Sequence, residues 1–332
     1  MKEKAKIFNW CKAFVLPLAV WAIFSIITAG RFATLTSILS VLRTAVVPLL
    51  LAMTLSFGMT MNMWNFSAGA VVYACAIFGA MFAGKLDMGI PGLCIFSILI
   101  GIILCTLMGI LYRQFRVPCL VLSLGVAMVV EALPGIFIKD GTGKISLLDG
   151  YLGSAPWCYI IVILMFAIFA YINSCTTLGA NMRAIGANIK IADSAGINID
   201  KTKFISFVLS GLFLGVAGIV HMSANVSVTG VTGFASASMI FDGIMGVFVA
   251  QVLARYINYN VAIIIGTITI RMLSAGLVAC GFSSEIRGIL TGVFLFVVVS
   301  YSTNAGLLER IRSRKRIAEQ ANEEYSKIEG RI

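Results

Sequence analysis

The segment from Ile90 to Tyr112, Ile-Pro-Gly-Leu-Cys-Ile-Phe-Ser-Ile-Leu-Ile-Gly-Ile-Ile-Leu-Cys-Thr-Leu-Met-Gly-Ile-Leu-Tyr, contains no charged residue. A helix of roughly 20 apolar residues is long enough to cross the hydrocarbon core of a lipid bilayer. Nine similar apolar runs flank it, at Ala13–Gly30, Ala45–Met61, Ser67–Gly84, Pro118–Ile138, Trp157–Asn173, Phe204–His221, Met239–Ala254, Val261–Ala279 and Ile286–Ser300. The sequence therefore predicts an all-α polytopic membrane protein, with about ten transmembrane helices in a transmembrane domain over residues 13–303.

The composition excludes an ordinary water-soluble domain. The 332 residues are 60% hydrophobic and only 12% charged, whereas soluble domains have about 45–50% apolar and about 25% charged residues. Lipid must therefore be the solvent of much of the chain.

The formal net charge of +11 would suit a nucleic-acid partner, but the positions of the basic residues indicate a membrane instead. With ten spans and a cytoplasmic N-terminus, 18 Lys and Arg residues fall on the cytoplasmic side and six on the outer side, and Arg271 lies inside a span. Cytoplasmic loops of membrane proteins are enriched in Lys and Arg. We therefore expect a cytoplasmic N-terminal arm at 1–12, a cytoplasmic C-terminal tail at 304–332 and no nucleic-acid partner.

No sequence pattern indicates a catalytic or metal centre. The eight cysteines are scattered without a Cys-x-x-Cys pair, and His221 is the single histidine. There is no Gly-x-x-x-x-Gly-Lys-Ser/Thr loop, so any ATP hydrolysis must occur on another chain. The first apolar run is longer than the roughly 7–15 residues of a signal-peptide core, which favours a retained helix. We expect no enzyme activity, no metal and no cofactor bound by this chain.

The longest cytoplasmic connection covers residues 174–203. Helix–helix connections usually need about 2–8 residues, so a polar segment of this length is expected to have a function. The run from Asn181 to Ala195 has no proline, and Gly196 and Asn198 fit a helix stop. The residues predict a short cytoplasmic helix. An amphipathic helix lying on the lipid surface is the alternative.

The second long connection covers residues 139–156 on the outer side. It is rich in Gly and Ser and has balanced charges. Such a composition fits either a loop that faces a partner or a plain surface loop.

The segment from Thr177 to Asp200 resembles the cytoplasmic signature of ribose-type permeases of binding-protein-dependent ABC importers. That signature reads approximately Gly-Asn-Asn-x-x-Ala-Ala-x-x-Ser-Gly-Ile. The residues of this chain that match it or lie within it are Gly186, Ala187, Asn188, Ala192, Ser194, Gly196 and Ile197. The resemblance implies that these residues form a coupling helix, which sits in a groove of a separate ATPase subunit.

Three other stretches are similar to the same family and follow in the same order. They are Trp64–Ala70, Val117-Pro118 with Ser123-Leu124-Gly125, and Gly281–Ser284 with Gly292. This chain departs from the family pattern at Asn65, where Asp is usual, at Ile240, where Glu is usual, and over Gln251–Asn260, where glycines are missing.

The family resemblance also implies partners and a location. The partners would be an ABC ATPase that binds ATP and Mg, an extracytoplasmic solute-binding protein, a second permease chain, identical or not, and the lipid bilayer. The location would be a bacterial plasma (inner) membrane, with both termini cytoplasmic.

A few polar residues within the spans are candidates for a solute pathway, because ionisable groups in a membrane are costly and need a partner, water or a role. Asp242 and Arg271 could pair across two helices, or Asp242 could lie at a helix start near the outer interface. Glu131 could line an outer vestibule or reach the interface from the end of its helix. Asn62, Asn65 and Ser67 suit hydroxyl-rich solutes, although a helix cap explains Asn65 and Ser67 equally well.

The sequence therefore predicts the permease subunit of an ABC importer for a small polar solute, with a monosaccharide as the first choice. Nucleosides, autoinducers and branched-chain amino acids are alternative solutes. An ion-coupled secondary transporter is a second class, which would need several intramembrane carboxylates. A membrane scaffold or sensor without transport activity is a third.

Overall fold

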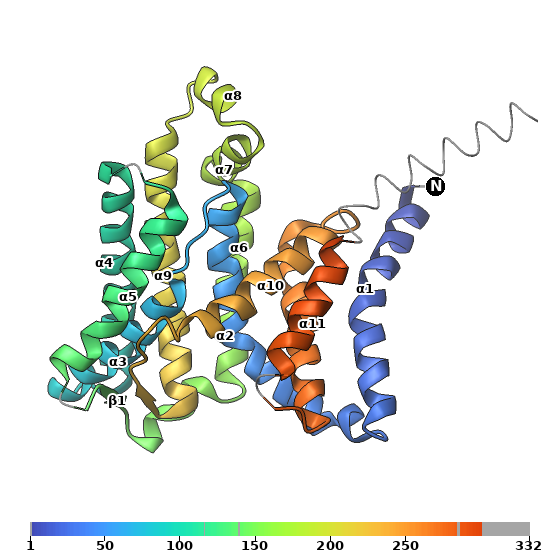
Figure 1. Ribbon diagram of the computed structural model, residues 1–332, viewed down its shortest axis with the longest axis horizontal. Helices are drawn as coiled ribbons and strands as arrows, with labels where there is room; N and C mark the ends of the chain where they lie inside the picture. Colours follow the sequence, from blue (N-terminus) through green and yellow to red (C-terminus); the bar gives the residue numbers. More distant parts are fainter. Residues whose placement is uncertain (1, 116, 139, 284–285, 301–332) are drawn as a thin grey trace, which may run out of the picture. The chain divides into compact units, whose positions relative to one another are not determined.

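The computed structural model describes residues 2–115, 117–138, 140–283 and 286–300, which are helical apart from short irregular segments and a two-stranded ribbon (Figure 1). Residues 1–282 form one compact unit and 283–332 a second, which contains an apolar helix over Ile286–Ser300. The elements of the first unit are α1 (Lys2–Ile27), η1 (Arg31–Ala33), α2 (Leu35–Thr60), α3 (Ala68–Lys85), α4 (Gly89–Phe115), α5 (Cys119–Phe137), β1 (Thr142–Lys144), η2 (Leu147–Gly153), α6 (Trp157–Cys175), α7 (Thr177–Ala187), α8 (Ile189–Ser194), α9 (Ile199–Asn225), β2 (Ser227–Thr229), α10 (Ala237–Leu253) and α11 (Tyr259–Ala279).

The helices confirm the predicted all-α polytopic architecture. Within the described part of the chain, α2, α3, α4, α5, α6, α9 and α11 are long and apolar enough to cross a membrane. Shorter apolar helices at Ala13–Ile27, Ala237–Leu253 and Ile286–Ser300 occupy the positions of the other three predicted spans. The number of ten spans stays a prediction. The predicted tail at 304–332 lies outside the described residues.

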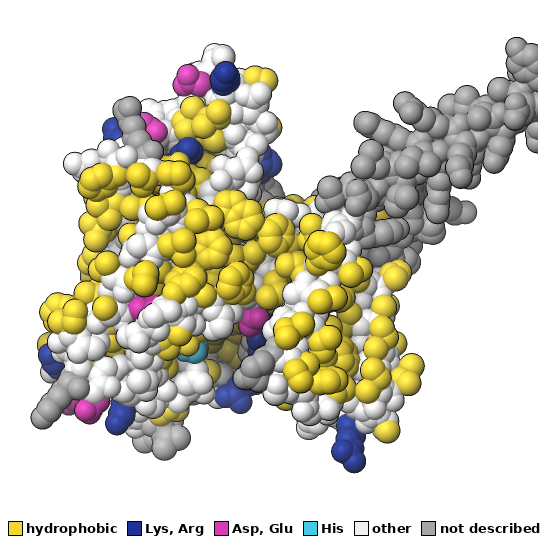
Figure 2. All heavy atoms as spheres, in the orientation of Figure 1, with side chains coloured by type: hydrophobic (Ala, Val, Ile, Leu, Met, Phe, Trp, Pro, Cys, Tyr) yellow, Lys and Arg dark blue, Asp and Glu magenta, His cyan; other side chains and the backbone are white. Residues whose placement is uncertain are grey.

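Large apolar side chains remain exposed on the outer helices. Ile95, Leu99 and Ile103 on α4 are about half exposed, and Ile163 and Leu164 on α6 are more so. On the face shown in Figure 2, hydrophobic side chains form broad patches, and most of the visible Lys and Arg side chains lie near the upper and lower margins. Since water would not stabilise such a surface, these helices present their apolar faces to lipid.

Helix α9 packs against α2, α3 and α4. Gly211 of α9 faces Gly101 of α4 so closely that a Cβ on either residue would overlap the carbonyl oxygen of the other. Further along α9, a Cβ on Gly218 would come within 2.6 Å of the Cys75 side chain on α3. Small residues let membrane helices approach closely. Because lipid is as apolar as the helices, there is no hydrophobic attraction between helices, and this close packing holds them together.

Three phenylalanines join α2, α6 and α9 beside this contact. The ring of Phe57 lies 5.1 Å from that of Phe169 and 5.6 Å from that of Phe213, centroid to centroid. All three side chains are fully buried or nearly so. Aromatic contacts of this kind fix the relative positions of the three helices.

The loop at 139–156, predicted to lie on the outer side, has its described part folded against the end of α9. Its strand β1 pairs antiparallel with β2, with Gly143 opposite Val228. Gly153 lies directly against Ala224 at the end of α9, and the Arg43 Nε donates a hydrogen bond of 3.1 Å to the Gly153 carbonyl. The described part of this loop is therefore anchored to the helices, and whether it faces a partner stays a prediction.

Replacing Gly211 with Ala should destabilise the protein, because the new methyl group would overlap the Gly101 backbone. Overpacking of this kind costs about 1–3 kcal/mol. Thermal unfolding of the purified protein in detergent, followed by tryptophan fluorescence, would measure the effect. The matched control is Gly125→Ala, because a Cβ at Gly125 has no atom within 4 Å. Equal melting temperatures for the two variants would contradict the close α4–α9 contact.

Candidate functional site

The predicted cytoplasmic helix is divided into two helices, α7 and α8, by Asn188. The backbone of Asn188 is extended, with φ at −162°, and its Oδ1 accepts hydrogen bonds from the N–H groups of Lys190 (3.0 Å) and Ile191 (3.3 Å). The helical character predicted for Asn181–Ala195 is therefore confirmed, but it belongs to two helices and not to a single short one. An asparagine that caps a following helix offers the chain an alternative to helical hydrogen bonding, and it ends the helix before it.

The end of α8 confirms one of the two predicted stop residues. Gly196 has a positive φ of 78°, its N–H donates to the Asp193 carbonyl, and the Ile197 N–H donates to the Ala192 carbonyl. This pair of bonds is a Schellman motif, which glycine favours because it adopts the left-handed conformation without strain. Asn198 instead begins α9, since its Oδ1 accepts from the backbone N–H three residues further on. Its assignment to a helix stop was wrong.

Helix α8 presents apolar side chains away from the bundle. Ile191 is 67% exposed and Ile189 is 46% exposed, while Ala192, the next residue after Ile191, is buried. The Ser194 hydroxyl donates to the Lys190 carbonyl within the helix. In Figure 1, α8 lies beyond the ends of α4 and α6. Two exposed apolar side chains at this place suit contact with a protein groove or a lipid surface.

The C-terminal end of α7 is seated against the C-terminal end of α2. A Cβ at Gly186 would overlap the Thr60 carbonyl oxygen, so only glycine allows this approach. The Asn62 side chain donates a hydrogen bond of 3.3 Å to the Gly186 carbonyl from the turn after α2, where Asn62 itself has a positive φ of 57°. Asn62, predicted to contact solute, instead contacts the end of α7.

A network of polar side chains joins α7 to the ends of α6 and α11. The Arg183 guanidinium donates to the backbone carbonyl and to the Oδ1 of Asn173. The Asn173 amide donates to the Asn260 Oδ1 (2.6 Å), and the Asn260 amide donates to the Ser174 Oγ (2.7 Å). Asn173 and Asn260, which are 87 positions apart in the sequence, are thus joined by a hydrogen bond at this end of the unit.

An open cavity of about 880 Å³ lies beside this network. Its size falls within the range of small-molecule sites. It is lined by Met59, Thr60, Phe166, Ala170, Asn173, Ser174, Arg183, Gln251, Asn258, Tyr259, Asn260 and Val261. The sequence patterns did not single out these residues as a site. The available signals were Asn173-Ser174 at the end of one apolar run and Asn258–Asn260 just before another.

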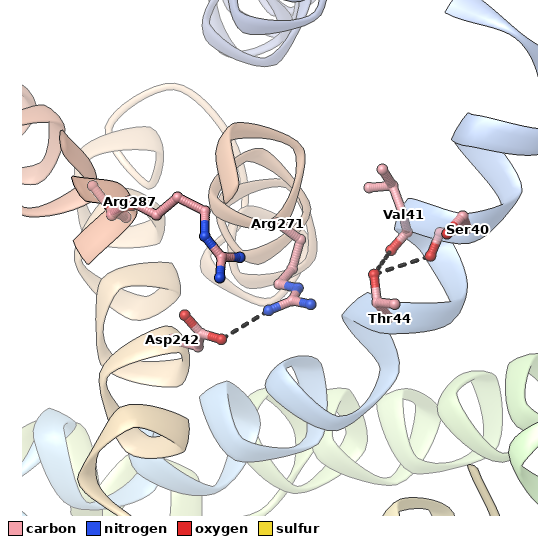
Figure 3. Close-up of polar contacts among 7 residues, drawn as sticks. Ser40, Val41, Thr44, Asp242, Arg271 and Arg287 are labelled. Carbon is pink, nitrogen blue, oxygen red and sulfur yellow. Dashed lines mark hydrogen bonds and ion pairs between the residues drawn. The ribbon is translucent and has the colours of Figure 1, made fainter. Parts of the chain in front are cut away.

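Asp242 and Arg271 form the predicted ion pair. The Arg271 guanidinium lies 2.8 Å from the Asp242 carboxylate, and Figure 3 shows the two side chains pointing toward each other from α10 and α11. Asp242 is in the second turn of α10, so its placement at the helix start was wrong. Because both side chains are only partly exposed, the pair clamps the two helices together.

Glu131 holds the segment that leads into α10. It is 3% exposed, and its two carboxylate oxygens accept hydrogen bonds from the backbone N–H groups of Phe234 (2.7 Å) and Ser236 (2.9 Å). Glu131 was predicted to line an outer vestibule or to reach the membrane interface. Both roles require an exposed side chain, so neither fits this burial. A carboxylate with two backbone donors is stabilised where it lies, because its charge is met by directed hydrogen bonds.

Asn65 and Ser67 are also buried and bonded to each other. The Asn65 Oδ1 accepts from the backbone N–H and from the hydroxyl of Ser67, which forms the turn before α3. Nearby, the Ser123 hydroxyl accepts from the Phe66 N–H and lies 3.2 Å from the Trp64 carbonyl. The two family-like stretches at Trp64–Ala70 and Val117–Gly125 are therefore in contact. Asn65 and Ser67 shape this turn and do not line the cavity.

Comparison with known proteins identifies the family. Residues 37–299 match the family model described as the branched-chain amino acid transport system / permease component. The chain is 29% identical over 210 residues to the probable ABC transporter permease protein YphD of Escherichia coli K12, covering 61% of each chain.

Two further relatives are autoinducer 2 import system permease proteins LsrC. The protein of Photorhabdus luminescens is 26% identical over 220 residues, which cover 64% of this chain and 65% of the relative. The protein of Yersinia pestis Pestoides F is 26% identical over 220 residues, covering 64% and 61%. The chain thus spans less than two thirds of the length of these relatives. Because the family model matches most of the chain, this protein is a divergent member of the branched-chain amino acid transport system permease component family, whose members are transport subunits.

Proposed function

We propose that this chain is the transmembrane subunit of an ATP-driven importer, and that it moves a small polar solute, a monosaccharide in the first place, into a bacterial cell. The observation that carries the proposal is the α7–α8 segment. It exposes two isoleucines beyond the bundle and is held tightly against α2 at Gly186. A segment with both properties can bind a partner and transmit the partner's movement to a transmembrane helix.

The partner at α8 is a separate ATPase subunit, which binds ATP and Mg. Ile189 and Ile191 enter a groove on that subunit, and burial of the two side chains supplies the affinity, at about 1.5–3 kcal/mol for each fully buried isoleucine. The Asn188 cap and the Gly196 stop keep α8 short and fix its direction. Without them, α8 would be free to rotate when the ATPase closes.

Movement of α7 reaches the transmembrane helices by two routes. The contact of Gly186 with Thr60 leads to α2, because glycine leaves no compressible side chain between the two backbones. The hydrogen bonds of Arg183 lead to Asn173 on α6 and onward to Asn260 on α11. Both routes end at the walls of the 880 Å³ cavity. Displacement of α7 would therefore change the shape of the cavity at this end.

The cavity serves as the inner end of the solute pathway in an alternating-access cycle. A second permease chain, identical or related, completes the pathway. An extracytoplasmic solute-binding protein delivers the solute at the opposite side, where the 139–156 loop is anchored. In this arrangement both termini are cytoplasmic, as the distribution of Lys and Arg favours.

The cavity lining supports a polar, hydroxyl-rich cargo. Asn173, Asn260 and Ser174 offer both donors and acceptors, which match sugar hydroxyl groups. The relatives named autoinducer 2 import permeases make an autoinducer of that kind the second candidate. Nucleosides and branched-chain amino acids follow.

Ion-coupled secondary transport fits these residues less well. Such a transporter needs a carboxylate that can bind and release an ion. Glu131 accepts two backbone hydrogen bonds, and Asp242 is paired with Arg271. Both carboxylates are engaged in structural contacts.

Replacing Gly186 with Leu should uncouple the ATPase from transport. The side chain would force α7 away from Thr60, and we expect solute-loaded binding protein to stimulate ATP hydrolysis at least about fivefold less, the lower end of typical coupling between two sites. Gly84→Leu is the control, because a Cβ at Gly84 has no atom within 4 Å. Normal stimulation in a membrane-inserted Gly186→Leu protein would disprove the coupling route.

Replacing Ile191 with Asp should weaken binding of the ATPase subunit by at least about tenfold, because a charge would be buried in the groove. Affinity purification of the chain followed by quantification of bound ATPase measures this. Ile191→Met keeps an apolar side chain and should bind normally. Because Ile191 is largely exposed, neither variant should affect folding. Unchanged ATPase recovery with Ile191→Asp would mean that α8 is not the docking element.

Uptake into proteoliposomes that contain the reconstituted complex tests the cargo. We expect ATP-dependent accumulation of a radiolabelled pentose or hexose in a panel that also includes autoinducer 2, nucleosides and branched-chain amino acids. Accumulation of autoinducer 2 alone would select the second candidate. Uptake driven by an ion gradient without ATP would refute the importer proposal.

A further inference from the structure

A second pocket lies between the C-terminal end of α4 and the N-terminal end of α9, on the same side as α8, which directly precedes α9. Its volume is about 250 Å³, and it is lined by Gly109, Tyr112, Arg113, Asp200, Lys203 and Phe204. It is smaller than sites that enclose a whole small molecule. The polar network around the 880 Å³ cavity shares none of these residues.

The pocket carries an excess of positive charge. Arg113 and Lys203 face a single carboxylate, Asp200, and among the described residues neither cation forms an ion pair. Lys203 Nζ instead donates to the Tyr112 hydroxyl at 3.1 Å and lies 5.3 Å from the centre of the Tyr112 ring. Since the hydroxyl oxygen accepts this bond, its hydrogen remains available to an acceptor in the pocket.

The floor of the pocket is apolar and closely packed. A Cβ at Gly109 would lie 3.0 Å from the Phe204 ring, so glycine lets this ring approach the α4 backbone. The Tyr112 ring packs on Phe207 at 5.7 Å. Lys203 is therefore held at the edge of an aromatic floor, with its ammonium group at the rim.

An exposed apolar stripe leads from this pocket toward the middle of α4. Leu99, Ile103, Leu107 and Ile110 are 46–55% exposed and recur at intervals of three or four residues before Arg113, which places them on one side of the helix. Ile103 lies about 15 Å from Arg113 along the axis, at 1.5 Å per residue. That distance is about half of the hydrocarbon thickness of a bilayer.

From this arrangement we infer that the α4–α9 pocket binds the phosphate headgroup of an anionic phospholipid, whose acyl chain lies along the apolar stripe of α4. Arg113, Lys203 and the Tyr112 hydroxyl contact the phosphate, and Phe204 contacts the glycerol backbone. Basic pockets between transmembrane helices at the membrane surface recognise anionic headgroups in this way. The inference requires only that α4 spans the membrane, so it stands independently of the transport proposal.

Lipid retention tests this site directly. The full-length chain is extracted from membranes that contain phosphatidylglycerol and phosphatidylcholine, and native mass spectrometry measures the lipid that remains bound. We expect the wild-type chain to retain phosphatidylglycerol over phosphatidylcholine, and the double variant Arg113→Gln, Lys203→Gln to lose at least about tenfold of that retention, as two charge-assisted hydrogen bonds would imply. The control variant Lys144→Gln, Arg255→Gln removes the same charges from exposed positions elsewhere and should retain the lipid.

Thermal unfolding provides a second readout that does not depend on extraction. Added phosphatidylglycerol should raise the melting temperature of the wild-type chain and of the control variant, and should leave that of the Arg113→Gln, Lys203→Gln variant unchanged. Equal retention by the double variant, or equal retention of phosphatidylcholine by the wild type, would overturn the inference. Stabilisation by inorganic phosphate or glycerol phosphate equal to that by phosphatidylglycerol would also overturn it, since the site would then bind a free anion.

Discussion

The backbone contact between α4 and α9 is the constraint on which the rest of the unit depends. Because Gly101 and Gly211 lack side chains, the two helices touch along their backbones, and α9 also packs against α2 and α3. Within lipid there is no hydrophobic force between helices, so such close packing must supply much of the association. Both ends of α9 then have defined places. Its start lies beside α8, and its end leads into the β1–β2 ribbon.

Buried polar groups in this protein fix the paths of irregular segments between the helices. The carboxylate of Glu131 accepts from the backbone before α10, Asn65 closes the turn before α3, and Ser123 joins that turn to α5. A membrane environment offers no water to these backbone N–H groups, so a side chain must serve each one. Glu131 and Asn65 were predicted to face solute or to lie at helix ends, because a polar residue in a span looks the same in the sequence whichever role it has.

One end of the unit contains the features for which we propose contacts with other molecules. The exposed isoleucines of α8, the seat of Gly186 on α2 and the asparagine network around the cavity lie there together. The cationic pocket of α4 and α9 lies at the same end. A partner on α8, a solute in the cavity and a lipid at the edge would therefore act on neighbouring helix ends, through rigid contacts rather than through flexible loops.

The sequence by itself determined the features that depend on residues close together in the chain. Apolar length predicted the helices, the motif around Gly186 to Ile197 predicted the family, and Gly196 predicted the end of α8. The Asp242–Arg271 pair could also be proposed, because an intramembrane charge requires a partner. Only the tertiary structure decided that Asn173 meets Asn260, that Asn62 meets Gly186 and that Glu131 is buried. Hydropathy and capping act over a few residues, whereas these contacts depend on which faces of distant helices pack together.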